Sequence, residues 1–232
     1  MEYKKIKYGI FKNRPNRFIA NVIVDEKEEV VHVKNTGRCK ELLVENAKVI
    51  LEESDNLNRK TKYSLVSVYK DAMLVNMDSQ APNSIVFEAM ESGVIKELGN
   101  IRFIKREATY SKSRFDFYFE SDKGKGYLEV KGVTLENNGL VSFPDAPTQR
   151  GKKHVMELIE AKKSGYYAGV LFLVQMKGSK MFSLNDVNDP EFSNAVRVAA
   201  ENGVEILCYD CIVKEDTVVF DERIDIDLKV NE

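Results

Sequence analysis

The chain has 232 residues, of which 43 % are hydrophobic and 31 % are charged, and its formal net charge is −2. This composition excludes a disordered or collagen-like chain, and the length suits two modest domains as well as one large one. No apolar run is long enough to cross a bilayer, and the basic N-terminal segment lacks the apolar stretch of a secretory signal. We therefore expect a cytoplasmic protein that has no membrane partner.

The first third of the sequence has the pattern of a small barrel. Short alternating segments run from residue 6 to residue 68, separated by Gly37 and by the polar stretch SDNLNRKTK, without a helical period. This pattern predicts a β-barrel or a curled sheet. In SIVFEAMESG, from Ser84 onward, the spacing becomes helical, which predicts a boundary near residues 76–82. We predict two domains, residues 1–80 and residues 81–232.

The second part alternates strands with helices, which is the order of an α/β domain. Strands are predicted in SRFDFYFE, YLEVKGV, AGVLFLVQ and VEILCYD, and the first two are joined by the turn SDKGKG. One helix is predicted from Thr148 to Ser164 and another after Asp189 and Pro190, because Thr and Asp are good N-caps and Pro suits the first helical position.

The three cysteines do not indicate a disulfide framework, since their number is odd and two of them share one apolar run. Cys208 and Cys211 lie three positions apart in a predicted strand, where residues at that spacing face opposite sides. We expect neither a metal site nor a redox pair there.

The predicted hairpin gathers three polar side chains. Alternation in SRFDFYFE places three phenylalanines on one face and Asp116 on the other, and in YLEVKGV it places Glu129 and Lys131 opposite Leu128 and Val130. Matching the apolar faces puts Asp116 opposite either Glu129 or Lys131. Both registers bring the three polar side chains together.

Two carboxylates and a lysine suit the hydrolysis of a phosphodiester. The carboxylates can hold Mg²⁺ or Mn²⁺, which neutralises the phosphate and lowers the pKa of a bound water, and the ammonium can position that water or stabilise developing charge. The alternative is an ordinary solvent-exposed charged face on a hairpin.

The spacing D-x12-E-x-K resembles the core of the PD-(D/E)xK nucleases. Longer segments are similar to the sugar fermentation stimulation protein (SfsA) family over nearly the whole chain: NTGR at 35–38, the SDN segment at 54–62, SRFDF, EVKGVTL and FPDAPTQRGKKH. Two departures are Arg38-Cys39 after NTG, where Ser-Met is expected, and Leu57 where a proline is usual.

The resemblance implies an N-terminal OB-fold-like β-barrel followed by a restriction-endonuclease-like α/β domain with a mixed central sheet. It implies DNA as a partner and an association with the control of sugar utilisation. Asp116, Glu129 and Lys131 fall on the catalytic positions. Asp116 and Glu129 fall on the metal-binding positions, with Glu88 as an additional acidic ligand.

Basic and amide-bearing residues supply the candidates for nucleic-acid binding. Some flank Gly37, some follow the SDN segment, and others lie beside Asp116 or in the first turns of the helix opened by Thr148, where a phosphate is favoured. These candidates are Asn35, Thr36, Arg38, Arg59, Lys60, Arg114, Arg150, Lys152 and Lys153.

Two functions follow, and the sequence does not decide between them. One is a DNA-binding protein with a Mg²⁺-dependent, nuclease-type site, which would make it a metal-dependent deoxyribonuclease. The other is a non-cleaving DNA-binding regulator of sugar fermentation genes. A carbohydrate-binding OB protein is a third reading, but it leaves the acidic hairpin and the basic clusters without a purpose. The strandedness of the DNA and the oligomeric state stay open.

Overall fold

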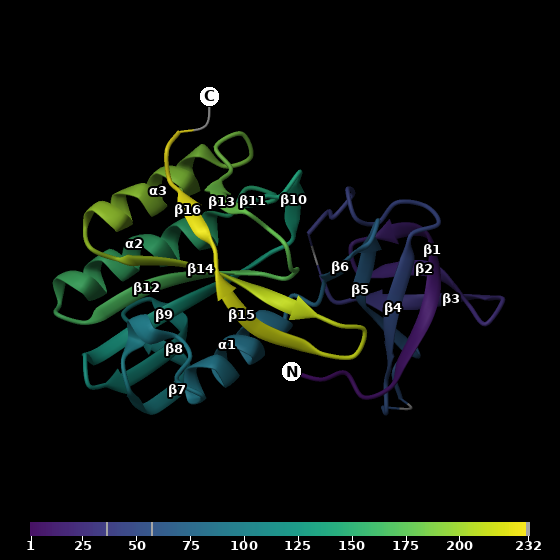
Figure 1. Cartoon of the computed structure of the whole chain (residues 1–232), viewed down its shortest axis with the longest axis horizontal. Coiled ribbons are helices and arrows are strands. Elements are labelled where there is room, and N and C mark those ends of the chain that lie inside the picture. The colour runs from purple at the N-terminus through teal and green to yellow at the C-terminus, as the bar shows by residue number, and fades with distance from the viewer. Residues whose placement is uncertain (36, 57, 231–232) are drawn as a thin grey trace.

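The computed structural model describes residues 1–35, 37–56 and 58–230, and its first part is a closed barrel (Figure 1). The strand order is β3-β2-β1-β4-β5-β6, and a parallel pairing of β3 with β5, His32 with Ser64, closes the sheet on itself. The predicted OB-like barrel is confirmed. Its strands are β1 (Ile6–Asn16), β2 (Ile19–Val24), β3 (Lys27–Val33), β4 (Lys48–Glu53), β5 (Tyr63–Lys70) and β6 (Met73–Asn76).

The second part is built on a mixed six-stranded sheet in the order β15-β14-β12-β9-β8-β7. The pairs β9–β12 and β12–β14 are parallel, and the outer pairs are antiparallel. The predicted restriction-endonuclease-like α/β domain is confirmed. These strands are β7 (Ile101–Tyr110), β8 (Ser113–Ser121), β9 (Gly124–Val133), β12 (Tyr167–Val174), β14 (Glu205–Val213) and β15 (Val218–Arg223).

Helices cover both faces of this sheet. In Figure 1, α1 (Ala81–Glu91) lies on one face, and α2 (Gln149–Lys163) and α3 (Pro190–Glu201) lie together on the other. A short 3₁₀ turn, Lys96–Leu98, follows α1. A small sheet in the order β10-β11-β13-β16 lies beside the main one and comprises β10 (Leu135–Asn137), β11 (Leu140–Phe143), β13 (Met181–Leu184) and β16 (Asp225–Asp227).

Local capping explains where α2 and α3 begin. The Thr148 side chain accepts a hydrogen bond from the Gly151 amide at 3.1 Å, and the Asp189 side chain accepts one from the Phe192 amide at 2.9 Å. Both side chains therefore satisfy an amide that the first turn leaves free. The N-caps predicted from the sequence are confirmed.

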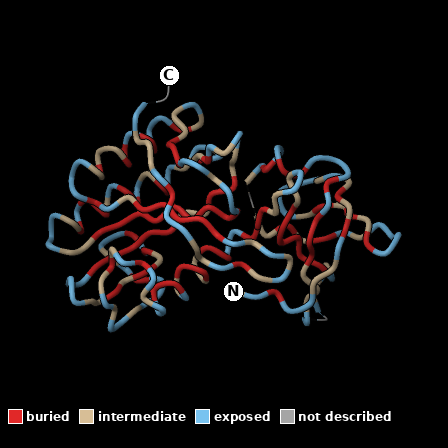
Figure 2. Tube along the Cα trace, in the orientation of Figure 1, coloured by how far each residue is buried: buried red, intermediate tan, exposed pale blue. Residues whose placement is uncertain are grey.

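The buried core does not stop at the predicted domain boundary. Figure 2 shows buried stretches in the barrel strands, the connection between the two parts and the central sheet. One cluster contains Val22 and Leu65 of the barrel together with Val155 and Phe172, and the other contains Ile50 together with Ile85. The division at residue 80 stays a prediction, because side chains from both parts pack in each cluster.

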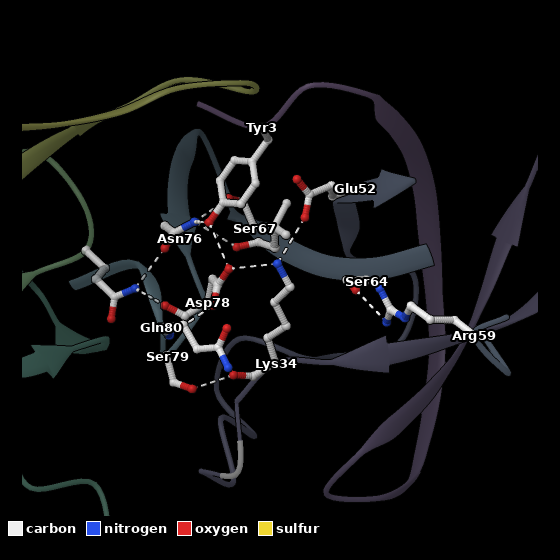
Figure 3. Close-up of polar contacts among 12 residues, drawn as sticks. Tyr3, Lys34, Glu52, Arg59, Ser64, Ser67, Asn76, Asp78, Ser79 and Gln80 are labelled. Carbon is white, nitrogen blue, oxygen red and sulfur yellow. Dashed lines mark hydrogen bonds and ion pairs between the residues drawn. The ribbon is translucent and has the colours of Figure 1, made fainter. Parts of the chain in front are cut away.

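A buried polar network also crosses the junction (Figure 3). Lys34 Nζ donates to Glu52 Oε2 at 2.9 Å and to Asp78 Oδ2 at 3.1 Å. Gln175, at the end of β12, donates from Nε2 to the Asn76 side chain at 2.8 Å and to the Asp78 carbonyl at 3.1 Å. The network therefore ties the barrel and the connection that follows it to the central strand of the second part.

The strand assignment of Cys208 and Cys211 agrees with their packing. Both thiols are buried and free, and they belong to different core clusters on opposite faces of the sheet. Within the described part of the chain, no helix has the length and apolar character needed to span a membrane.

Candidate active site

Asp116 lies where the hairpin of β8 and β9 stops pairing. The last matched pair is Phe117 with Leu128, so the register brings Asp116 beside Glu129 rather than Lys131. The Val130 amide, which in a continued ladder would meet a backbone carbonyl, donates instead to Asp116 Oδ2 at 2.8 Å. The Asn83 side chain, from the first turn of α1, donates to Oδ1 at 2.7 Å. Both carboxylate oxygens are therefore oriented.

The predicted single face of three phenylalanines is wrong for Phe115. Its ring packs against Tyr127 at 5.5 Å and His154 at 6.0 Å, in the cluster under α2, whereas Phe117 and Phe119 pack in the cluster under α1. The alternation therefore breaks at Asp116. On the neighbouring strand, Glu107 has a positive φ of 52°, so the backbone departs from regular strand geometry at this level.

Glu129 is the most buried acid of the site, at 3 % exposed. Its Oε1 accepts hydrogen bonds from Lys131 Nζ and from His154 Nδ1, both at 2.6 Å. Its Oε2 is buried without a hydrogen-bond partner among the described residues. Burial tends to raise the pKa of this carboxyl, but the hydrogen bonds from His154 and Lys131 outweigh it, and the pKa lies below its usual value.

The pKa of Asp116 shifts in the opposite direction. Burial, followed by the nearby charge of Glu129, raises the pKa of Asp116 above its ordinary value, and the hydrogen bonds from Val130 and Asn83 offset only part of that effect. The two carboxylates thus influence one another and have divergent proton affinities. This is the condition expected where two acids share one functional site.

The structure does not bring Glu88 to this pair. Its side chain is 56 % exposed and accepts a hydrogen bond from the N-terminal amine of Met1 at 2.6 Å. Within the described residues, no three acidic, histidine or cysteine side chains come close enough to hold one metal ion. The acidic site of the structure is therefore the pair Asp116 and Glu129.

Two residues of the site were not singled out from the sequence. Asn83 orients Asp116, but the apolar period of α1 becomes visible only from Ser84, one position later. His154 was not assigned to the site from the sequence, and the structure buries it with Nδ1 2.6 Å from Glu129 Oε1. Its position directly before the apolar stripe that begins at Val155 was the one available signal.

The nucleic-acid-binding candidates on the barrel lie around two loops. Asn35 Oδ1 accepts a hydrogen bond from the Gly37 amide at 2.7 Å, and Arg38 is exposed. Thr36 lies outside the described residues, as does Leu57. Arg59 is half-buried and donates to the Ser64 hydroxyl at 3.0 Å, and Lys60 is exposed.

The candidates of the second part lie near the hairpin. Arg114 is exposed, with Glu107 at 3.5 Å, and Arg150 is exposed in the first turn of α2. Lys152 pairs with Glu191 at 2.9 Å. Lys153 donates to the Lys112 carbonyl at 2.9 Å, which ties α2 to the turn between β7 and β8.

A closed OB-like barrel followed by a restriction-endonuclease-like α/β domain, with Glu129 buried and Asp116 half-buried beside it, defines a class of two-part proteins. Family models agree with both halves: the "SfsA N-terminal OB domain" matches residues 13–77, and the "Sugar fermentation stimulation protein RE domain" matches residues 80–217. The chain belongs to the sugar fermentation stimulation protein family.

Relatives match the chain over nearly its full length. A sugar fermentation stimulation protein homolog from Alkaliphilus oremlandii is 56 % identical over 99 % of this chain and 100 % of its own. A homolog from Clostridium botulinum is 52 % identical over 97 % of this chain and 98 % of its own. The solved structure of Pyrococcus furiosus SfsA in complex with Ca²⁺ is similar with a TM-score of 0.89, at 26 % identity and 98 % coverage of each chain.

Proposed function

We propose that the chain binds DNA and carries a Mg²⁺- or Mn²⁺-dependent phosphodiester-cleaving site made of Asp116, Glu129 and Lys131. The observation that carries the proposal is the Glu129 Oε2 atom, which is buried without a hydrogen-bond partner among the described residues. Leaving such an acceptor unsatisfied costs about 1–3 kcal/mol. A cation held between the two carboxylates would satisfy it.

The donor set fits a hard divalent cation. Asp116 and Glu129 supply carboxylate oxygens, and the lowered pKa of Glu129 keeps that group ionised at neutral pH. The Pyrococcus furiosus relative was solved in complex with Ca²⁺, which supports a divalent cation as a ligand of this chain. A bound Mg²⁺ or Mn²⁺ would neutralise the phosphate and make a water more acidic.

The residues around the pair orient it. Asn83 and the Val130 amide fix Asp116, while His154 and Lys131 fix Glu129 from one side. Lys131 donates one N–H group to Glu129. Its other N–H groups have no hydrogen-bond partner among the described residues, so they can position a water or stabilise charge on the phosphate. Each side chain of the trio therefore has a partner that holds it in place.

Exposed cations would bind the DNA backbone. Arg38 and Lys60 on the barrel and Arg114 and Arg150 near the hairpin are exposed, so they can meet phosphates. Asn35, Arg59, Lys152 and Lys153 remain candidates, and Thr36 is a candidate from the sequence alone. We place this activity in the cytoplasm, with the division near residue 80 separating the barrel from the cleaving domain.

The second candidate function is a DNA-binding regulator that does not cleave. The name of the family, sugar fermentation stimulation, favours this reading, because it describes an effect on fermentation rather than a reaction on DNA. Such a protein would control sugar fermentation genes and would retain the acidic pair as a binding site for a cation that bridges to phosphate.

Cation binding tests the site without relying on activity. Calorimetric titration with Mn²⁺ or Ca²⁺ should give saturable binding to the parent and a loss of about tenfold or more in Asp116→Asn and Glu129→Gln, since each removes one charged oxygen ligand. Glu88→Gln is the matched control, because it removes an exposed carboxylate of the same domain. Unchanged cation affinity in the two site variants would contradict the proposal.

A further inference from the structure

A basic pocket lies at one end of the barrel, outside the catalytic hairpin. It has a volume of about 450 Å³ and lies between the turn that joins β1 to β2 and the loop after β3. The single acid in its lining, Glu45, is 3.1 Å from Lys12. The cations that line it are Lys12, Arg14, Arg17, Arg38 and Lys40.

Arg14 fixes the wall of this pocket. Its guanidinium donates to the carbonyls of Gly37 at 2.7 Å, Asn35 at 2.6 Å and Arg17 at 2.7 Å, and also to that of Arg38 at 3.0 Å. One side chain therefore joins the β1–β2 turn to the loop after β3. Such a preformed wall lowers the entropic cost of binding a ligand.

Three of the other cations are available to a ligand. Among the described residues, no carboxylate lies within ion-pair distance of Arg17, Arg38 or Lys40, and all three are exposed. The side-chain oxygen of Asn16 accepts a hydrogen bond from the Phe18 amide at 2.9 Å, and that of Asn13 accepts one from the Asn21 side chain at 3.1 Å. Their amide N–H groups remain as donors, so the pocket offers donors to a ligand rich in acceptors and negative charge.

A second pocket adjoins the basic pocket at Gly37. A smaller polar pocket of about 190 Å³ shares Gly37 with it and reaches Gly132, which directly follows Lys131. Asp145 also lines this smaller pocket and lies against Gly37, since a Cβ on Gly37 would stand 2.5 Å from Asp145 Oδ2. The two pockets therefore adjoin at the Gly37 loop, on the side of the barrel that meets β9.

The far end of the barrel carries the opposite charge. There, a pocket of about 640 Å³ is lined by Asp25, Glu26, Asp71 and Glu215, with Lys48 as its one cation. This end would repel a phosphate backbone. The basic pocket is therefore a local feature of the barrel and not an effect of the overall charge.

We propose that the basic pocket binds one unpaired nucleotide of the DNA strand that occupies the catalytic hairpin; this inference rests on the proposed DNA binding. Two lining residues, Phe11 and Leu43, are almost fully buried, so the pocket has an apolar floor under a basic rim. An unpaired base can lie on such a floor while its phosphate meets the rim, whereas a base paired within a duplex stays stacked. The preferred ligand is thus a single strand or a duplex with a single-stranded tail.

The test compares Arg17→Ala/Lys40→Ala with Lys27→Ala/Lys48→Ala, which removes two exposed lysines at the far end of the barrel. The probes are labelled oligothymidylate, a tailed duplex and a blunt duplex, each measured in the full-length protein at several salt concentrations. For the pocket variant we expect about tenfold weaker binding of the first two probes and a salt slope reduced by about one to one and a half, at about 0.7 per phosphate contact.

The blunt duplex separates this inference from a general loss of charge, because its affinity should change no more in the pocket variant than in the control. Equal loss on all three probes, or no difference between the pocket variant and the control, would overturn the inference. A parent protein that binds none of the probes would contradict the proposed DNA binding as well. If the parent binds the probes and the pocket variant binds them equally well, the pocket inference is contradicted and the proposed DNA binding stands.

Discussion

Asn83 donates a hydrogen bond from Nδ2 to Asp116 Oδ1 at 2.7 Å and so joins the first turn of α1 to the point where the hairpin stops pairing. The contact links the first helix of the α/β domain to the acidic site. Because Asp116 is half-buried beside the negative charge of Glu129, a donor at this position favours its charged form.

Replacing Asn83 should therefore weaken the site without unfolding the domain. We expect Asn83→Ala to lower metal-dependent cleavage about tenfold, since a hydrogen bond to a charged group contributes ~1.5–3 kcal/mol. Steady-state cleavage of a labelled DNA fragment at saturating Mn²⁺ measures the effect. Ser84→Ala, the next residue of the same helical turn, is the control, and equal rates for the two variants would show that Asn83 has no role.

His154 should contribute to both stability and cation affinity, because it donates to a carboxylate that is almost fully buried. Among the described residues, His154→Ala leaves Glu129 with Lys131 as its one remaining hydrogen-bond donor. We expect a loss of ~1–3 kcal/mol in the free energy of unfolding. Denaturant unfolding measures this loss, and Mn²⁺ titration of the folded variant should show weaker binding. Full retention of both would mean that the 2.6 Å contact is energetically unimportant.

The pair Lys70 and Glu136 predicts a pH-dependent stability. Lys70 Nζ of the barrel donates to Glu136 Oε2 at 2.5 Å and to its carbonyl at 2.6 Å, while Glu136 Oε1 accepts from the Gly139 amide at 2.5 Å. Burial tends to raise the pKa of Glu136, but Lys70 and the Gly139 amide lower it by more, so it lies below its ordinary value. The folded protein therefore binds this proton less readily than the unfolded chain.

The stabilisation should be complete above the ordinary carboxyl pKa and should disappear as the pH falls through the lowered value. We expect Glu136→Gln to reduce the free energy of unfolding by ~1–2 kcal/mol at neutral pH. The free energies of unfolding of the parent and the variant should then converge at acidic pH. Thermal unfolding over a pH series measures the difference, and a constant difference at every pH would contradict the assignment to this ion pair.

Gly132 should be required for the contact between the two parts of the chain. A Cβ at this position would stand 2.4 Å from Gln175 Oε1 and 2.8 Å from Pro82 Cγ. We expect Gly132→Ala to destabilise the fold by ~1–3 kcal/mol through overpacking. If the new Cβ collides with Gln175, the double variant Gly132→Ala/Gln175→Ala should lose less free energy of unfolding than the sum of the two single losses. Strict additivity of the two losses would exclude Gln175 as the obstacle.

Local signals predicted much of the fold. Thr148 and Asp189 are N-caps in the structure because a cap depends on residues three positions apart. The polar trio Asp116, Glu129 and Lys131 was visible because strand alternation and a short turn are also local. The family resemblance added the OB-like barrel, whose closure by β3 and β5 is a non-local pairing that periodicity does not reveal.

Other features depend on contacts between distant segments. Phe115 turns to the opposite face because the ladder ends at Asp116, and nothing in the alternation of SRFDFYFE marks that break. His154 and Asn83 meet the carboxylates from two helices that are far apart in sequence. Glu88 was assigned by analogy, and the structure instead places it against the N-terminal amine, at a site that only tertiary packing creates.

The most direct test of the central claim is cleavage of labelled single- and double-stranded DNA with Mg²⁺ or Mn²⁺ by the parent, Asp116→Asn and Glu129→Gln. DNA binding by the same preparations is measured in parallel. The account predicts cation-dependent cleavage by the parent and its loss in both variants, with DNA binding retained. Salt-sensitive DNA binding by the parent without any cleavage would contradict the claim and favour the non-cleaving regulator.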